Sequence, residues 1–227
     1  MPAGTDTTRA FGVWIAESCT PDSLVLDVGA GYDRNHVDAT VHPLVACLVG
    51  VDPSDNILSN QSLHERHQAT LTEFAQRDAR QFDIVCACWV LEHVSDPSEF
   101  FSECRGLLKP GGELFIITPN LWHYFGLTAK ASSALGIEER MLGKLMGTER
   151  KAEYHFPTAY KANSIRAIKR LLGEAGFTRV EFRCCDTPRD YDYIVPSQFR
   201  WFPKLYSRLV YQLHAPTYMG RLMFSAS

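Results

Sequence analysis

Two carboxylates and two glycines stand at the ends of apolar segments, where a ligand could be bound. The stretch "LVLDVGAG" places Asp27 near the end of an apolar run, with Gly29 and Gly31 directly after it. Glycine lets a ligand approach the main chain and adopts torsion angles that other residues resist. Asp27 would repel a pyrophosphate and attract a cationic amino or sulfonium group. The next apolar run ends in "VGVDPS", where Asp52 is placed to accept hydrogen bonds from two ribose hydroxyls.

The segments that must position these residues alternate between strand and helix patterns. A helix is predicted from Asp96, a capping residue, to just before Pro110, and a second over about 163–175. This alternation predicts an α/β fold with a mostly parallel sheet and helices on both faces. In such a sheet, ligands bind outside the carboxyl ends of the strands. Continuous apolar runs typical of buried strands lie at 24–28, 46–51, 84–90 and 113–118.

Composition narrows the class of protein. The 227 residues, 45% of them hydrophobic, predict a single domain over 1–227. A formal charge of −3 gives no general attraction for nucleic acid. The seven cysteines lie mostly in apolar stretches, which favours reduced, buried thiols in a cytoplasmic protein over metal ligands. There is neither a signal-peptide pattern nor an apolar run of about 18 residues, so we expect a protein that does not span a membrane.

Four motifs resemble those of one enzyme family. They are "LVLDVGAGYDR", "VGVDPS", "FDIVCACWVLEHVSDP" and "GLLKPGGELFIITPN". In this order they resemble class I S-adenosylmethionine-dependent methyltransferases, above all the bacterial group with "LEHV" after the fourth strand. The resemblance covers about residues 20–120 and resumes with "YHFPTAYKANSIRAIKRLLGEAGF". It implies a Rossmann-like seven-stranded sheet with an antiparallel last strand, S-adenosyl-L-methionine as cofactor, and methyl transfer as the reaction.

The resemblance also assigns cofactor-binding residues. The family's usual "GDA" before an adenine-contacting loop has no obvious counterpart here, and Ala69, Thr70 and Leu71 are the nearest positions. His93 matches the histidine of the "LEHV" motif. The other implied contacts are Asp27, Gly29, Ala30 and Gly31 in the first motif, Asp52 and Pro53 at the ribose, and Cys88 and Trp89 beside the methionine moiety.

Residues 121–160 interrupt the strand–helix alternation just after a predicted central strand. We expect them to form a mostly helical lid, an insertion that carries the acceptor pocket. A hydroxyl or acidic-carbon acceptor would need a general base, for which histidine has a suitable pKa. His123 and His155 lie in this segment and are the leading candidates, with His93 as a third.

The segment 201–213 repeats apolar residues at helical spacing, with Lys204 and Arg208 beside them. This pattern is typical of a helix packed on its own domain or on a dimer partner, but it also fits peripheral membrane contact. The stretch "RLMFSA" then reads as the last strand, antiparallel and paired with "RVEFRC".

The sequence therefore predicts methyl transfer to a small-molecule acceptor, with oxygen favoured as the methylated atom. A glycan, a lipid-linked intermediate and a secondary metabolite are candidate acceptors, and the protein is expected to be a monomer or a homodimer. Two alternatives remain open. One is a nucleotide-binding oxidoreductase or epimerase, which the absent third glycine and the absent Tyr-x-x-x-Lys pair disfavour. The other is a non-catalytic subunit that keeps the methyltransferase fold.

Overall fold

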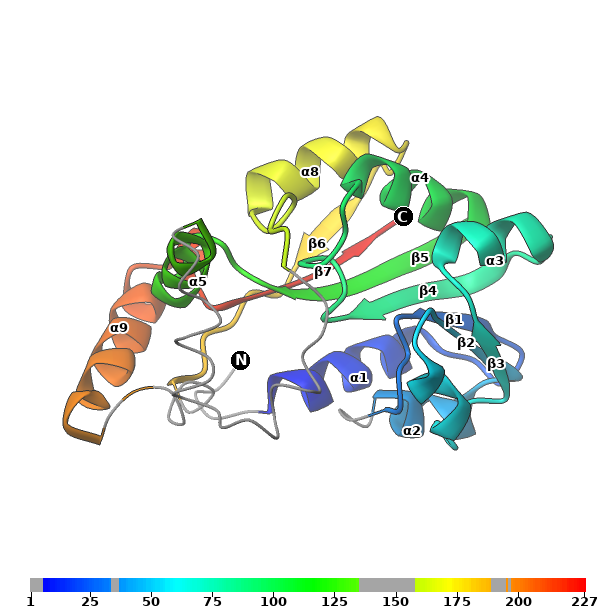
Figure 1. Ribbon diagram of the computed structural model, residues 1–227, viewed down its shortest axis with the longest axis horizontal. Helices are drawn as coiled ribbons and strands as arrows, with labels where there is room; N and C mark the ends of the chain where they lie inside the picture. The colour runs from blue at the N-terminus through cyan, green and yellow to red at the C-terminus, as the bar shows by residue number, and fades with distance from the viewer. Residues whose placement is uncertain (1–5, 34–36, 135–157, 189–194, 196) are drawn as a thin grey trace.

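Seven strands form one sheet in the order β3-β2-β1-β4-β5-β7-β6 (Figure 1). The computed structural model describes residues 6–33, 37–134, 158–188, 195 and 197–227. The predicted fold class is confirmed, including the antiparallel last strand. Five strands run parallel to one another: β1 (Leu24–Val28), β2 (Cys47–Asp52), β3 (Glu65–Gln68), β4 (Phe82–Cys88) and β5 (Leu108–Pro119). The strand β7 (Arg221–Ala226) is antiparallel to both β5 and β6 (Val180–Phe182).

Helices cover both faces of the sheet (Figure 1). On one face lie α3 (Leu71–Arg77), α4 (Pro97–Leu107) and α8 (Ile165–Glu174), and on the other α1 (Thr7–Ser18) and α2 (Val37–Val41). Each face has its own apolar core, built around Phe101 and Phe224 on the first and Phe11 and Phe115 on the second. The sheet is therefore buried on both sides, which explains the continuous apolar runs of its central strands.

The predicted helix boundaries are largely confirmed. The side chain of Asp96 accepts hydrogen bonds from the main-chain N–H groups of Ser98 and Glu99, so it caps α4 as expected. The helix ends at Leu107, before the predicted Pro-Gly-Gly stop, because Leu108 is already extended and begins β5. Ser164 caps α8. Gly176 follows that helix with a positive φ of 87°, the conformation that commonly ends a helix.

Two helices lie beyond the carboxyl end of β5: α5 (Tyr124–Ala134) and α9 (Trp201–Gln212) (Figure 1). The first belongs to the predicted lid, most of which, with His155, lies outside the described residues. Both ends of the lid segment are attached near the sheet, since Leu121 N–H donates to the Asn163 carbonyl and Ala159 N–H to the Glu92 carbonyl. Its opening and closing stay a prediction. Short 3-10 turns complete the described elements: η1 (His42–Leu44), η2 (Asp55–Ser59), η4 (Ser197–Phe199) and η5 (Pro216–Tyr218).

Candidate cofactor site

The turn after β1 is fixed by packing as well as by hydrogen bonds. Gly29 has a φ of 74°, and its N–H donates to the Val51 carbonyl at 2.7 Å. A Cβ on Gly29 would overlap the side chain of Val90, in the loop after β4. A side chain here would therefore disturb the packing of the protein itself, and contact of Gly29 with a cofactor stays a prediction. The packing brings the loops after β1 and β4 together.

Gly31 and Asp52 form an open cradle at the ends of β1 and β2. Gly31 has a φ of 47°, and a Cβ there would meet only the Asp52 Oδ2 atom, at 3.9 Å. The Gly31 N–H donates to Asp52 Oδ2 at 3.1 Å, and the Ser54 N–H donates to Oδ1 at 2.7 Å. Because a carboxylate accepts about four hydrogen bonds, Asp52 keeps capacity for ligand hydroxyls. The open space and this capacity fit a ribose, and the exposed Pro53 borders them.

Asp27 faces a second buried carboxyl group that the sequence did not indicate. Burial, followed by the nearby Asp38 carboxyl, raises the pKa of Asp27 well above its ordinary value, and burial raises that of Asp38 to about 6. The Cys86 thiol donates to Asp27 Oδ1 at 3.4 Å, and Asn60 Nδ2 donates to Asp38 Oδ2 at 2.8 Å. Two adjacent buried carboxyls favour one shared proton. The isolated negative charge expected at Asp27 is thus replaced by a pair that carries about one charge.

We expect Asp38→Asn to flatten the pH dependence of stability. The pKa of Asp38 is raised from 3.8 to about 6, so the folded state binds more protons and loses stability as pH rises through that window. Two pKa units correspond to roughly 2–3 kcal/mol. In urea unfolding from pH 4 to 7, the wild type should lose this amount of unfolding free energy relative to the variant. The exposed Asp55→Asn is the control, and parallel curves for Asp38→Asn and wild type would contradict the shared proton.

The tip of β4 brings three predicted residues to the same edge of the sheet. Trp89 has a φ of 61°, rare for a non-glycine residue, and its N–H donates to the Ile117 carbonyl at 3.1 Å. Its ring lies under the Arg221 guanidinium, 5.0 Å away. Burial raises the pKa of the half-buried Cys88 thiol, which keeps it neutral. His93 is half-buried in the following turn.

Glu92 is a buried acid at this edge that the sequence motifs did not single out. Its Oε2 accepts from the Thr118 hydroxyl at 3.0 Å, and Asn163 Nδ2 donates to the same hydroxyl at 2.6 Å. Burial raises the Glu92 pKa to about 7. Its position within "LEHV" was the only available signal, because its partners come from β5 and the start of α8.

The predicted adenine-contacting positions lie beside Asp52. The Ala69 N–H donates to the Asp52 carbonyl at 3.1 Å, so this segment lies next to the end of β2. Thr70 caps α3 through a reciprocal pair of bonds with Glu73, and the Leu71 side chain is buried. Ala30, in the first motif, is also buried. Contact of Ala69, Thr70 and Leu71 with an adenine ring stays a prediction.

His123 is built into a buried network. Its Nδ1 accepts from the Phe125 N–H at 3.3 Å, which leaves the proton on Nε2, 3.1 Å from Asp186 Oδ1. The side chain is 1% exposed, and burial lowers its pKa despite the carboxylate. Its ring packs on those of Tyr124 and Tyr206. Both ring nitrogens are therefore engaged by the protein, and a role as general base stays an untested prediction.

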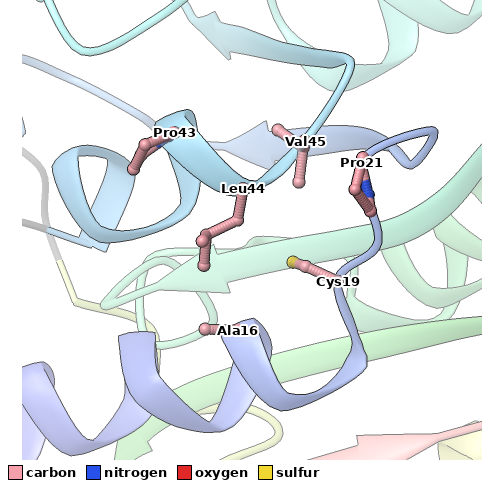
Figure 2. A pocket seen from close by; sticks show the side chains of 6 residues that line it. All are labelled: Ala16, Cys19, Pro21, Pro43, Leu44 and Val45. Carbon is pink, nitrogen blue, oxygen red and sulfur yellow. The ribbon is translucent and has the colours of Figure 1, made fainter.

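A cavity of about 300 Å³ lies at the opposite end of the sheet (Figure 2). It is lined by residues that precede β1 and β2, among them Pro21 and Val45, so it faces the amino ends of these strands. None of the predicted site residues lines it. The chemistry points instead to the carboxyl edge, where the cradle lies.

Solved structures share this fold over nearly the whole chain. A methyltransferase from Mesorhizobium loti covers 98% of this chain and 98% of its own, with a TM-score of 0.58 and 16% identity. Phosphoethanolamine N-methyltransferase 2 from Haemonchus contortus, solved with S-adenosyl-L-methionine, covers 98% of this chain and 52% of its own, with a TM-score of 0.53 and 16% identity. A family model described as a methyltransferase domain matches residues 26–116. Residues 26–116 are therefore similar to a methyltransferase domain, and the chain shares its fold with solved S-adenosylmethionine-dependent methyltransferases.

Curated proteins similar to this chain include a ubiquinone biosynthesis O-methyltransferase from Coxiella burnetii. The two are 36% identical over 103 residues, which is 42% of this chain and 43% of the relative. The match thus spans less than half of the curated relative. One of the solved structures holds S-adenosyl-L-methionine, and contact of its ribose with Gly31 and Asp52 in this chain stays a prediction. The similarity to methyltransferases does not support the oxidoreductase or epimerase alternative.

Proposed function

We propose that this methyltransferase transfers the methyl group of S-adenosylmethionine to an oxygen atom of a small-molecule acceptor. The observation that carries the proposal is the cradle of Gly31 and Asp52, open toward solvent at the carboxyl ends of β1 and β2. When bound, the cofactor supplies an electrophilic methyl group on a sulfonium. The curated relatives, named as O-methyltransferases, support oxygen as the atom methylated.

The chain's own residues would do three things. Asp52 would hold the ribose hydroxyls, while the Asp27–Asp38 pair places negative charge near the first motif. The loop after β4, with Trp89 and His93, would border the acceptor. Holding the acceptor oxygen about 3 Å from the methyl carbon supplies much of the rate enhancement, and a histidine would take the hydroxyl proton.

The acceptor itself is proposed only as a class. A glycan, a lipid-linked intermediate or a secondary metabolite would each present a hydroxyl group. The lid over residues 121–160 is proposed to shape the pocket that selects among them. Membrane contact through 201–213 and the choice between monomer and homodimer stay predictions here.

We expect Asp52→Ala to weaken binding of S-adenosylhomocysteine by about 1.5–3 kcal/mol. This is the magnitude for losing charge-assisted hydrogen bonds to the ribose. Titration calorimetry on the folded variant measures it directly. Asp55→Ala, exposed in the neighbouring turn η2, is the matched control and should bind like wild type. Unchanged affinity in Asp52→Ala would remove Asp52 from the site.

A product assay separates an enzyme from a non-catalytic subunit, which the titration alone does not. Both would bind S-adenosylhomocysteine, but only an enzyme would form a product heavier by one methylene group. A metabolite extract incubated with the protein and cofactor, then compared by mass, provides this readout. Cofactor binding without any such product across extracts would favour the non-catalytic alternative.

A further inference from the structure

Helix α9 leaves a row of large apolar side chains in contact with solvent. At about 100° per residue, Trp201, Phe202, Leu205, Leu209 and Leu213 fall on one side of the helical path. Their exposed fractions lie between 43% and 73%. We call these five residues the α9 apolar face. Exposed apolar patches of this kind mark interaction surfaces far more often than scattered single residues do.

The opposite side of α9 is already used for packing. Pro203, Ser207 and Val210 are buried. The Tyr206 hydroxyl donates to the Tyr218 carbonyl at 2.7 Å, and the Asp186 N–H donates to the Tyr211 hydroxyl at 3.0 Å. One side of the helix thus packs on the domain, and the α9 apolar face on the other side is exposed to solvent.

The charged side chains of α9 itself have one sign. Residues 197–227 contain no aspartate or glutamate, and they include Lys204 and Arg208. Both side chains are exposed, and the helical spacing places them along one border of the α9 apolar face. The whole chain has a net charge of −3, so the charge of this border is opposite in sign to that of the chain. An apolar face with the cations Lys204 and Arg208 along one border complements an anionic lipid surface.

We propose that α9 is a peripheral membrane-docking helix that binds anionic bilayers. The five apolar side chains insert among the acyl chains, and Lys204 and Arg208 contact the lipid phosphates. A protein partner with an apolar groove would bury the same residues, but it would not require the two cations Lys204 and Arg208 beside them. The inference does not depend on the proposed methyl transfer, because vesicle binding is measured without cofactor or acceptor.

The position of α9 connects docking with the cofactor site. Figure 1 shows α9 beside α5, beyond the carboxyl end of β5 and away from α2 and β3. The cradle of Gly31 and Asp52 belongs to this same carboxyl edge of the sheet. A docked protein would therefore turn the acceptor side of its sheet toward the bilayer, where an apolar acceptor would be concentrated.

Flotation of the full chain with vesicles tests the proposal. The protein should float with vesicles of equal parts phosphatidylglycerol and phosphatidylcholine, and much less with phosphatidylcholine alone. High salt should weaken binding by screening the cationic border. Brominated phosphatidylcholine in the anionic vesicles should quench tryptophan fluorescence, and Trp201→Phe should reduce that quenching.

Two sets of variants separate the two contributions. Lys204→Glu with Arg208→Glu should lower vesicle partitioning on the order of 10²-fold. Arg77→Glu with Arg166→Glu changes the net charge by the same amount, at exposed positions of α3 and α8. This control pair should change vesicle partitioning little. Leu205→Ser with Leu209→Ser should also abolish flotation, whereas Leu58→Ser with Leu44→Ser, at exposed positions away from α9, should not.

The contrary results are equally defined. Failure of the wild-type chain to float with anionic vesicles at low salt would overturn the proposal. Equal losses from the control pairs would mean that general charge or hydrophobicity drives binding. A dimer in solution that Leu205→Ser with Leu209→Ser dissociates, without vesicle binding, would assign the α9 apolar face to self-association instead.

Discussion

Replacing His123 by alanine is expected to destabilise the folded protein by about 3–5 kcal/mol, before any effect on catalysis is considered. The imidazole Nε2 lies 3.1 Å from the buried Asp186 carboxyl group and Nδ1 accepts from the Phe125 N–H, so its loss removes both contacts from a buried site. It also opens a cavity between Tyr124 and Tyr206. Chemical denaturation should show a lower midpoint, and thermal unfolding a decrease of roughly 10 °C.

A conservative replacement separates structure from chemistry. In His123→Gln, the side-chain amide can still donate to Asp186, so much of the stability should return. Turnover measured on this folded variant then tests the base directly. His67→Ala, at a half-buried position in β3, is the control for removing an imidazole. If His123→Ala unfolds like wild type while its turnover collapses, His123 is catalytic and the structural assignment is wrong.

Replacing the true general base is expected to lower kcat by 10²–10⁴ without changing S-adenosylhomocysteine affinity. His93 and His155 are the candidates to test first, because both ring nitrogens of His123 are engaged by the protein. We expect His93→Gln or His155→Gln to show the loss. In wild type, kcat should rise with pH as the base loses its proton, and the affected variant should lose that rise.

The alternative outcome points to a third group. If both glutamine variants keep wild-type turnover and pH profile, neither histidine accepts the proton. Glu92 would then be the group to replace, because its pKa is raised to about 7 and it lies at the same strand edge. Glu92→Gln keeps the size of the side chain, so a loss of kcat with an intact fold would identify Glu92 as the group that accepts the proton. His214→Gln, exposed after α9, is the control for both histidine variants.

The features of this fold that depend on local patterns could be predicted. The apolar run that ends at Asp52 defines both the strand and its tip, because a parallel strand buried on both faces needs an unbroken apolar stretch. Asp96 marks the start of α4 by itself, since a cap acts within its own turn. The seven-stranded sheet with its antiparallel last strand followed from the resemblance of four motifs to those of one enzyme family.

The features that depend on distant neighbours could not be predicted. Asp38 carries no motif, and only the fold places it against Asp27 and Asn60. The engagement of His123 depends on Asp186, which a separate part of the chain brings to it. Gly29 was correctly placed in the turn. The close packing of Val90, from the loop after β4, is a further reason why this position has no side chain, and the sequence did not indicate it.

The position of β7 between β5 and β6 has a consequence for how the chain is made. This strand pairs with β5 on one side and β6 on the other, and among the described residues β6 forms a strand ladder only with β7. During synthesis, β1 to β5 leave the ribosome first and can assemble, while Val180–Phe182 waits without a sheet to join. Addition of β6 and β7 to the sheet must therefore be delayed until residues 221–226 emerge. Until then the nascent chain exposes an open edge along β5, which is a natural binding point for chaperones and a liability for aggregation.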